Sequence, residues 1–283
     1  MKTRVPALLA AGALSLSLAA CGGESAEPEE TTEAAAEESA TEGGGVLSLL
    51  ADLASNTEEV DNYTLAMAMS MTDPEFGETS MDLTYEVMDD PQAAQVTIVM
   101  PDIGEMMLEL AELGGETTDL TAEELGTSIV IVPAEGEALV SNHNGNLEVD
   151  TAWARGASGM DSMPTPEDMF DVSSLSDVAD AIASIESAEE AGTEEISGVE
   201  TTRVDGTLTR EQIDALPEEQ SSALNELIGG SVEGSMNTSV WISEDGFPMR
   251  MDFSDDVSDV SMVFSALGET SFEMPAEDEI TDL

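Results

Sequence analysis

The amino-acid sequence predicts an α+β fold, in which one strongly curved antiparallel sheet holds a few helices in its concave face. Segments in which apolar and polar residues alternate recur along the chain, as strands with one buried and one exposed face require. Turn sequences containing glycine separate several of these segments. Amphipathic helical patterns interrupt them, and such helices bury their apolar stripes most economically against the apolar face of the sheet.

The first 20 residues have the layout of a secretory signal peptide. Lys2 and Arg4 supply positive charge, and residues 5–18 are almost wholly apolar but shorter than the roughly 20 residues that span a bilayer. The segment ends in Leu-Ala-Ala-Cys21, which resembles the lipobox of bacterial lipoproteins. An ordinary signal peptide with a stray cysteine fits less well, because Cys21 is the only cysteine and stands where a lipobox needs it. We therefore expect cleavage before Cys21 and an anchor of palmitate-like acyl chains on it.

Residues 21–45 are expected to form a lipid-anchored, acidic and disordered tether. From residue 24 onward this segment has many carboxylates, no bulky apolar residue and a terminal run of glycines. It cannot bury enough apolar surface to repay the entropy of ordering it. As a flexible coil it spans roughly 25–30 Å, and it holds a single domain, residues 46–283, off the membrane. The expected location is the outer face of the cell membrane.

The charge balance excludes one class of partner. The chain has 6 Lys plus Arg against 62 Asp plus Glu, a formal net charge of −56, and Lys2 is its only lysine. Nucleic-acid binding is excluded because phosphate contacts need clustered Lys and Arg, and an anionic membrane face repels this surface. The favoured interpretation is a halophilic adaptation, since high salt screens the repulsion between carboxylates. The alternative, a cation-binding surface, lacks a calcium loop of the D-x-D-x-D-G type.

The first third of the domain reads as a helix, three strands and a short helix. Residues 46–56 place their apolar residues on one helical face. Residues 65–72, 81–87 and 94–100 alternate between apolar and polar positions, as strands with one wet face do. Residues 106–113 form a short helix that two glycines end.

The remaining elements follow the same two patterns. Residues 128–132 and 137–141 read as a hairpin around Gly136, and an Asn144-Gly145 turn leads into a strand at 147–154. Helices are expected over 174–189, 210–215 and 217–228, and strands over 199–208, 238–243, 248–254, 257–266 and 271–274.

Several segments resemble one family of bacterial lipoproteins. Residues 198–209, GVETTRVDGTLT, look like its central strand, and residues 240–251, VWISEDGFPMRM, resemble its V-W-I-D-x-D-G-L-P-x-R-M hairpin. Residues 264–268 and the ending MPAEDEITDL look like its closing strand and P-x-x-D-x-I-x-D-L tail. The family is the LppX/LprA/LprF/LprG group of actinobacterial lipoproteins, related in fold to the LolA and LolB carriers. The resemblance runs from residue 46 to the end and is most specific over the last third of the chain.

This resemblance implies a LolA/LolB-like half-barrel wrapped around helices, with an apolar cavity between sheet and helices. Members of the group bind acylated glycolipids or similar lipids, help to move them across the cell envelope, and are not enzymes. For this chain it implies three partners: an acylated lipid or glycolipid, the membrane through the Cys21 anchor, and an envelope transport protein.

Residues that would support catalysis or metal binding are scarce. His143 is the only histidine and lies in a predicted turn, so we expect it to be a solvated turn residue; a lone histidine without cysteine cannot build a common zinc site. The sequence has no G-x-S-x-G nucleophile motif and no glycine-rich phosphate loop before a helix. We expect no enzymatic activity, no cofactor and no metal.

Methionine is the residue type that favours a ligand cavity. The chain has 17 methionines, whereas only 4% of its residues are aromatic. Methionine is flexible and polarizable, which suits a surface that accommodates acyl chains, although ordinary core packing with Met in place of Leu is the alternative. Alternation places one apolar residue set on a single face of the sheet, and we expect this set to line the cavity: Met67, Met69, Met71, Met81, Leu83, Tyr85, Val96, Ile98, Met100, Met249, Met251, Phe253, Val260, Met262 and Phe264.

Two function classes remain. The first is a membrane-anchored lipoprotein that binds acylated lipid or glycolipid in an apolar cavity and carries it across the cell envelope. The second is an envelope module without transport, either a sensor ectodomain or an assembly factor, that binds a partner protein.

Overall fold

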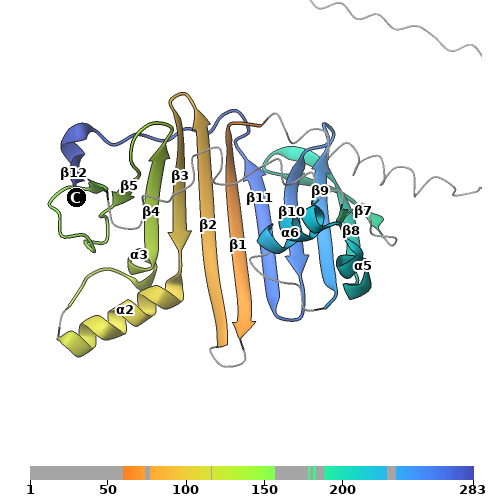
Figure 1. Ribbon diagram of the computed structural model, residues 1–283, viewed down its shortest axis with the longest axis horizontal. Helices are drawn as coiled ribbons and strands as arrows, with labels where there is room; N and C mark the ends of the chain where they lie inside the picture. The colour runs from red at the N-terminus through yellow and green to blue at the C-terminus, as the bar shows by residue number, and fades with distance from the viewer. Residues whose placement is uncertain are drawn as a thin grey trace, which may run out of the picture. The chain divides into compact units, whose positions relative to one another are not determined.

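The described strands form one open, curved sheet of 12 strands in the order β12-β6-β5-β4-β3-β2-β1-β11-β10-β9-β8-β7 (Figure 1). The computed structural model describes residues 60–73, 77–115, 117–156, 178, 181–182, 188–227 and 234–283, all within one unit, Ala40–Leu283. Every neighbouring pair in the sheet is antiparallel except β12 and β6, which run parallel.

The strands account for most of the described residues. Their bounds are β1 Tyr63–Asp73, β2 Gly77–Asp89, β3 Gln92–Val99, β4 Thr127–Pro133, β5 Leu139–Ser141, β6 Trp153–Arg155, β7 Glu189–Ile196, β8 Val199–Leu208, β9 Met236–Ser243, β10 Pro248–Ser254, β11 Ser258–Ser265 and β12 Ile280–Asp282. Long strands occupy the middle of the sheet and short ones its β12 end.

The helices that the structure describes from end to end are few and short. Their bounds are α2 Pro101–Gly114, α3 Ala122–Leu125, α5 Arg210–Ala215, α6 Glu218–Leu227 and a 3₁₀ turn, Glu277–Glu279. The helix α2 begins before the predicted residue 106, because Pro101 fits the first helical turn, where no intrahelical N–H bond is lost. It ends at Gly115, whose φ of 78° is the left-handed conformation that glycine adopts without strain.

One face of the sheet packs against helices. Leu65 of β1 and Phe264 of β11 are fully buried in a core cluster that also contains Ile182 from a helical segment, Ile213 of α5 and Leu224 of α6. The aromatic ring of Phe264 meets those of Tyr63 and Phe247 edge to face at centroid distances of 5.8 and 5.1 Å. This arrangement confirms the predicted fold class, a curved antiparallel sheet with a few helices against one face.

The helix predicted for residues 174–189 extends too far. Val178, Ala181 and Ile182 are helical and buried, but Glu189 already begins β7. The sequence EEAGTEEI of β7 offers no alternation from which a strand could be predicted, and only Ile196 is buried. β7 lies at an edge of the sheet, where its exposed carboxylates discourage pairing with strands of other chains.

The strand predicted for residues 147–154 is wrong over most of its length. Only Trp153–Arg155 pair with β5, as β6. The Asn142 side chain holds the preceding residues as a loop: its oxygen accepts from Leu147 N at 2.9 Å, and its amide nitrogen donates to Val149 O at 3.1 Å. These bonds occupy backbone groups that a strand ladder would need.

The strand predicted for residues 271–274 is also wrong. Both sides of β11 are already paired, with β1 and β10, so no edge is free where this segment leaves the sheet. The chain instead crosses the end of the sheet to reach β12 beside β6 (Figure 1). Its start is held at Thr270, whose backbone N–H donates to Asn62 Oδ1 at 2.8 Å while Asn62 Nδ2 donates to Thr270 O at 3.2 Å.

Some predictions lie outside the described residues: the signal peptide, Cys21, the tether and the helix at 46–56. Among the helices that the structure does describe, none has the length and apolar character that crossing a membrane requires.

Candidate functional site

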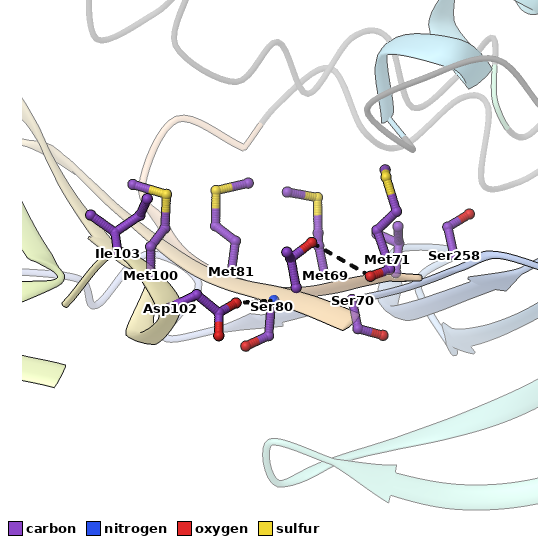
Figure 2. A pocket seen from close by; sticks show the side chains of 11 residues that line it. Met69, Ser70, Met71, Ser80, Met81, Met100, Asp102, Ile103 and Ser258 are labelled. Atoms are coloured by element: carbon purple, nitrogen blue, oxygen red, sulfur yellow. Dashed lines mark hydrogen bonds between the residues drawn. The ribbon is translucent and has the colours of Figure 1, made fainter. Parts of the chain in front are cut away.

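An apolar pocket of about 360 Å³ lies at one end of β1 and β2, where β11 and the start of α2 complete its wall. The lining combines methionine and aliphatic side chains with a few small polar residues: Met69, Ser70, Met71, Thr79, Ser80, Met81, Met100, Asp102, Ile103, Ser258 and Val260. In Figure 2, the four methionines and Ile103 project to one side of the strands, and Ser70 and Ser80 point to the other.

Strand register brings these methionines together. Met69 of β1 lies opposite Met81 of β2 on one side and opposite Val260 of β11 on the other. Two residues along, Met71 lies between Thr79 and Ser258. Since side chains alternate between the faces of a strand, these register partners share the face that the core occupies farther along the sheet.

The start of α2 forms the remaining wall. The chain leaves β3 at Met100, and Pro101 turns it directly into the helix, so Ile103 lies beside Met100 at the pocket. The Ser80 backbone N–H donates to Asp102 Oδ2 at 3.2 Å, which ties the first turn of α2 to β2 (Figure 2). Met71 is 47% exposed and Ile103 41% exposed, so the pocket opens to solvent at this end.

Of the residues expected to line a cavity, five do so: Met69, Met71, Met81, Met100 and Val260. Six others on the same face are buried members of the core cluster: Met67, Met249, Met251, Phe253, Met262 and Phe264. Leu83 and Tyr85 pack half-buried against that cluster, where burial raises the pKa of the Tyr85 hydroxyl. Val96 is buried in β3, and Ile98 is half-buried beside it.

The sequence pattern did not identify Ile103, Thr79 and Ser258 as residues that line the pocket. Ile103 fell outside the predicted helix, although the Pro101 signal for a helix start was present in the sequence. Thr79 and Ser258 interrupt the apolar alternation, and only their register against Met71 places them at the pocket.

The opposite face of the same strands is polar. A hollow of about 500 Å³ there contains serines and aspartates, among them Ser70, Asp82, Asp252 and Ser261. The Asp252 carboxylate already accepts hydrogen bonds from the Arg250 guanidinium at 2.7 Å and from Ser261 Oγ at 2.7 Å. Within the described ranges, no group of three or more His, Cys, Asp or Glu residues is arranged to hold a metal ion.

Two arginines enclose a tryptophan on this polar face. The guanidinium carbons of Arg203 and Arg250 lie 4.9 and 4.6 Å from the ring centroid of Trp241, within the range of cation–π contacts. Trp241 Nε1 donates to Glu194 at 2.8 Å, and its side chain is almost fully buried. The stack lets a charged surface cover a large aromatic side chain.

All four arginines of the described region are paired with carboxylates. Arg155 bonds Glu277 and Asp282, Arg203 bonds Asp205, Arg210 bonds Asp214 and Arg250 bonds Asp252, at 2.7–3.0 Å. His143 lies exposed in the loop after β5, with its Nδ1 3.1 Å from Ser141 Oγ. None of these arginine and histidine side chains lines the apolar pocket.

The fold is similar to those of two mycobacterial proteins, the lipoprotein LppX and LprF, whose names belong to the group that the sequence resembles. LppX from Mycobacterium tuberculosis has 15% sequence identity and a TM-score of 0.41, over 81% of this chain and 98% of that one. LprF from Mycobacterium bovis has 14% identity and a TM-score of 0.41, over 83% and 98%. A LolA superfamily protein from Nitrosomonas europaea has 9% identity and a TM-score of 0.27, over 81% and 94%. No protein-family model matches the chain, and no curated protein matches it.

Proposed function

We propose that this protein is a membrane-anchored lipoprotein that binds an acyl chain of a lipid or glycolipid in the methionine-lined pocket and carries it across the cell envelope without catalysis. The observation that carries the proposal is the pocket itself, where Met69, Met71, Met81 and Met100 meet Ile103 and Val260. An apolar, solvent-accessible surface built of flexible side chains favours a flexible apolar ligand.

The pocket chemistry favours an acyl chain over a polar molecule. The polar atoms near its edge are engaged: Ser80 N–H bonds Asp102, the Thr79 hydroxyl contacts Met71 O at 3.5 Å, and the Ser258 hydroxyl donates to Asp255 at 2.8 Å. A volume of about 360 Å³ is at the lower end of the roughly 300–1,000 Å³ usual for small-molecule pockets. It suits one acyl chain better than several.

The charges favour a lipid without a negative headgroup. Each arginine that the structure describes is already in an ion pair, and the net charge of the whole chain is −56. A phosphate near the pocket would meet Asp102 and no cation among the lining residues. A sugar or another uncharged headgroup meets no such repulsion.

The membrane anchor rests on the Leu-Ala-Ala-Cys21 sequence. Mass spectrometry of the N-terminal peptide tests it, with a diacylglyceryl-modified Cys21 as the expected result. The Cys21→Ala variant should be released from the membrane or remain an uncleaved precursor. A variant that is processed and retained like the native chain would show that Cys21 is not the anchor.

Lipid binding is tested by gentle extraction of the full chain, followed by mass spectrometry of the molecules that co-purify. We expect one acylated, uncharged lipid per protein, displaced by excess of a monoacylglycerol. If no lipid co-purifies and a fluorescent monoacylglycerol does not bind saturably, the carrier role is wrong and the partner-binding role of an envelope module takes its place.

A further inference from the structure

The helix α2 exposes an apolar stripe next to the pocket. The stripe consists of Ile103, Met106, Leu110 and Leu113, whose side chains are 41, 50, 60 and 85% exposed. Their spacing of three, four and three residues places them on one helical face. Over ten residues at 1.5 Å each, this face extends about 15 Å along the helix axis. In Figure 1, α2 projects from the end of β3 away from the strands.

The stripe cannot turn inward, because α2 is fixed by its contact with α3. Gly104 is buried against that helix, and a Cβ at this position would lie 1.7 Å from the carbonyl oxygen of Ala122. A Cβ on Gly126 would likewise lie 2.2 Å from Met100 O. Only glycine permits this approach, so the rotation of α2 about its axis is set by backbone contacts.

The other flank of α2 is acidic. Asp102, Glu105, Glu109 and Glu112 are exposed and follow the same three- to four-residue spacing, turned away from the stripe. The helix therefore has three sides: one packed on α3, one acidic and one apolar and exposed. The apolar side contains only carbon and sulfur side-chain atoms and offers no hydrogen bond to an occupant.

The stripe and the pocket are continuous. Ile103 belongs to both, since it lines the pocket beside Met100 and begins the exposed stripe. An acyl chain that moves along α2 toward the pocket would therefore keep apolar contact from Leu113 to Met69. Such a path favours a ligand that starts in an apolar phase, because the acyl chain keeps apolar contact instead of being exposed to water.

We propose that the α2 stripe inserts into the uncharged surface of a lipid bilayer and leads acyl chains from the bilayer into the pocket. This proposal rests on the proposed function. Amphipathic helices lie in the membrane interface with their apolar face roughly 5–10 Å deep. The acidic flank restricts the surface to zwitterionic or neutral lipids, because anionic headgroups would repel it.

A second copy of the chain fits this surface poorly. In a twofold interface the same patch meets itself, so the acidic flanks of the two α2 helices would lie close together, in a chain that carries 62 acidic residues. A bilayer of uncharged lipids covers the stripe without this repulsion.

Insertion is tested with tryptophan fluorescence of the full chain on phosphatidylcholine vesicles that contain brominated lipid, a contact quencher. Leu110→Trp places the probe on the stripe, and Glu112→Trp on the acidic flank of the same helix is the matched control. After subtraction of the native Trp153 and Trp241 signals, we expect quenching to remove about half or more of the Leu110→Trp emission and little of the control. Replacing a third of the lipid with phosphatidylglycerol should weaken the quenching at low salt.

Equal quenching of the two probes would overturn the proposal, as would stronger quenching with anionic lipid. No quenching would assign the stripe to a protein partner. A blue shift of the Leu110→Trp emission that grows with protein concentration in the absence of vesicles would assign it to a second copy.

Transfer measurements separate this proposal from the proposed function. Leu113→Glu should slow uptake of a fluorescent lipid from phosphatidylcholine vesicles about tenfold, yet leave binding of a water-soluble monoacylglycerol unchanged, with Glu112→Ala as the control. If both variants take up vesicle lipid like the native chain, the α2 path is wrong and the pocket stands. If the native chain binds no monoacylglycerol, the pocket function is wrong.

Discussion

Met69 of β1 lies directly opposite Met81 of β2 in the antiparallel ladder, and both line the pocket. The next pair outward, Met71 and Thr79, continues the same face toward solvent, and Met71 is 47% exposed. The next pair inward, Met67 and Leu83, joins the core. The β1–β2 ladder thus runs from packed core to open pocket within a few residues.

Filling the pocket should block ligand binding and leave the fold intact. Met81→Trp adds volume at a half-buried position beside about 360 Å³ of free space, so overpacking is avoided. We expect monoacylglycerol affinity to fall about tenfold or more with a change in unfolding free energy of about 1 kcal/mol or less. Fluorescence titration and urea unfolding measure the two quantities.

Met274→Trp is the matched control for that variant, since Met274 is also half-buried but lies in the segment that crosses to β12. It should bind lipid like the native chain. A Met81→Trp protein that is folded and retains full affinity would place the ligand elsewhere.

The contact of α2 with α3 should position the pocket wall. Gly104→Ala forces a Cβ against Ala122 O, which we expect to displace α2 and to cost about 1–3 kcal/mol. Because Met100 and Ile103 move with the helix, lipid affinity should fall as well. Gly114→Ala in the same helix meets no atom within 4 Å of its Cβ and should leave stability unchanged or raise it by about 0.5–1 kcal/mol. Equal effects of the two changes in thermal unfolding would contradict this role of Gly104.

The Asn62 side chain should stabilise the segment that follows β11 and should lower the pKa of Asp89. Asn62 is buried, and its side chain donates to Asp89 Oδ1 at 2.7 Å and bonds the Thr270 backbone in both directions. Asn62→Ala leaves these backbone groups unpaired, and we expect it to cost about 1–3 kcal/mol in chemical unfolding. Asn146→Ala, at an exposed loop position, should have little effect.

The hydrogen bond from Asn62 is the main cause that lowers the pKa of Asp89 below its ordinary value. Because the folded-state pKa is the lower one, the stabilisation is present above the unfolded-state pKa of about 3.9 and is lost as the pH falls through the folded-state pKa. In Asn62→Ala the pKa of Asp89 should rise toward its ordinary value. Carboxyl-carbon NMR titration measures it, and an unchanged pKa would refute the assignment.

Salt should stabilise the protein by screening its carboxylates. Glu195 of β7 lies directly opposite Glu200 of β8, an unfavourable pair of like charges. The Debye length falls from about 30 Å at 0.01 M to about 3 Å at 1 M salt, so the melting temperature should rise over this range. Glu200→Gln should add about 0.2–1 kcal/mol at low salt, and this gain should vanish at 1 M. A melting temperature independent of salt would contradict the halophilic interpretation.

The sequence predicted the strands whose two faces differ. In β1, alternation from Leu65 to Met71 identified the apolar face correctly, and β8 was predicted with its observed bounds, Val199–Leu208. It could not predict β7, because an edge strand with carboxylates on both faces has no alternation. Nor could it place the loop that Asn142 holds, because that loop depends on side-chain bonds to Leu147 and Val149.

The sequence predicted which face of the sheet contains the site, but not which residues of that face are buried in the core and which line the pocket. Met67 and Met71 have the same place in the alternation, yet Met67 is buried in the core and Met71 is exposed at the pocket mouth. What separates them is the packing of distant segments: Phe264 and Met262 of β11 and the helices that cover them. Ile103 joins the pocket only because Pro101 starts α2 directly after β3. Such tertiary contacts leave no local periodicity.

Contact between acyl chains and the pocket methionines is tested by NMR of the full chain labelled with ¹³C-methyl methionine. A monoacylglycerol with a nitroxide on its acyl chain should broaden the methyl signals of Met69, Met71, Met81 and Met100, which line the pocket. The signals of Met236 and Met249, buried in the core, should persist. If the probe binds and leaves the four pocket signals sharp, or broadens the core signals equally, the pocket is not where the acyl chain is held.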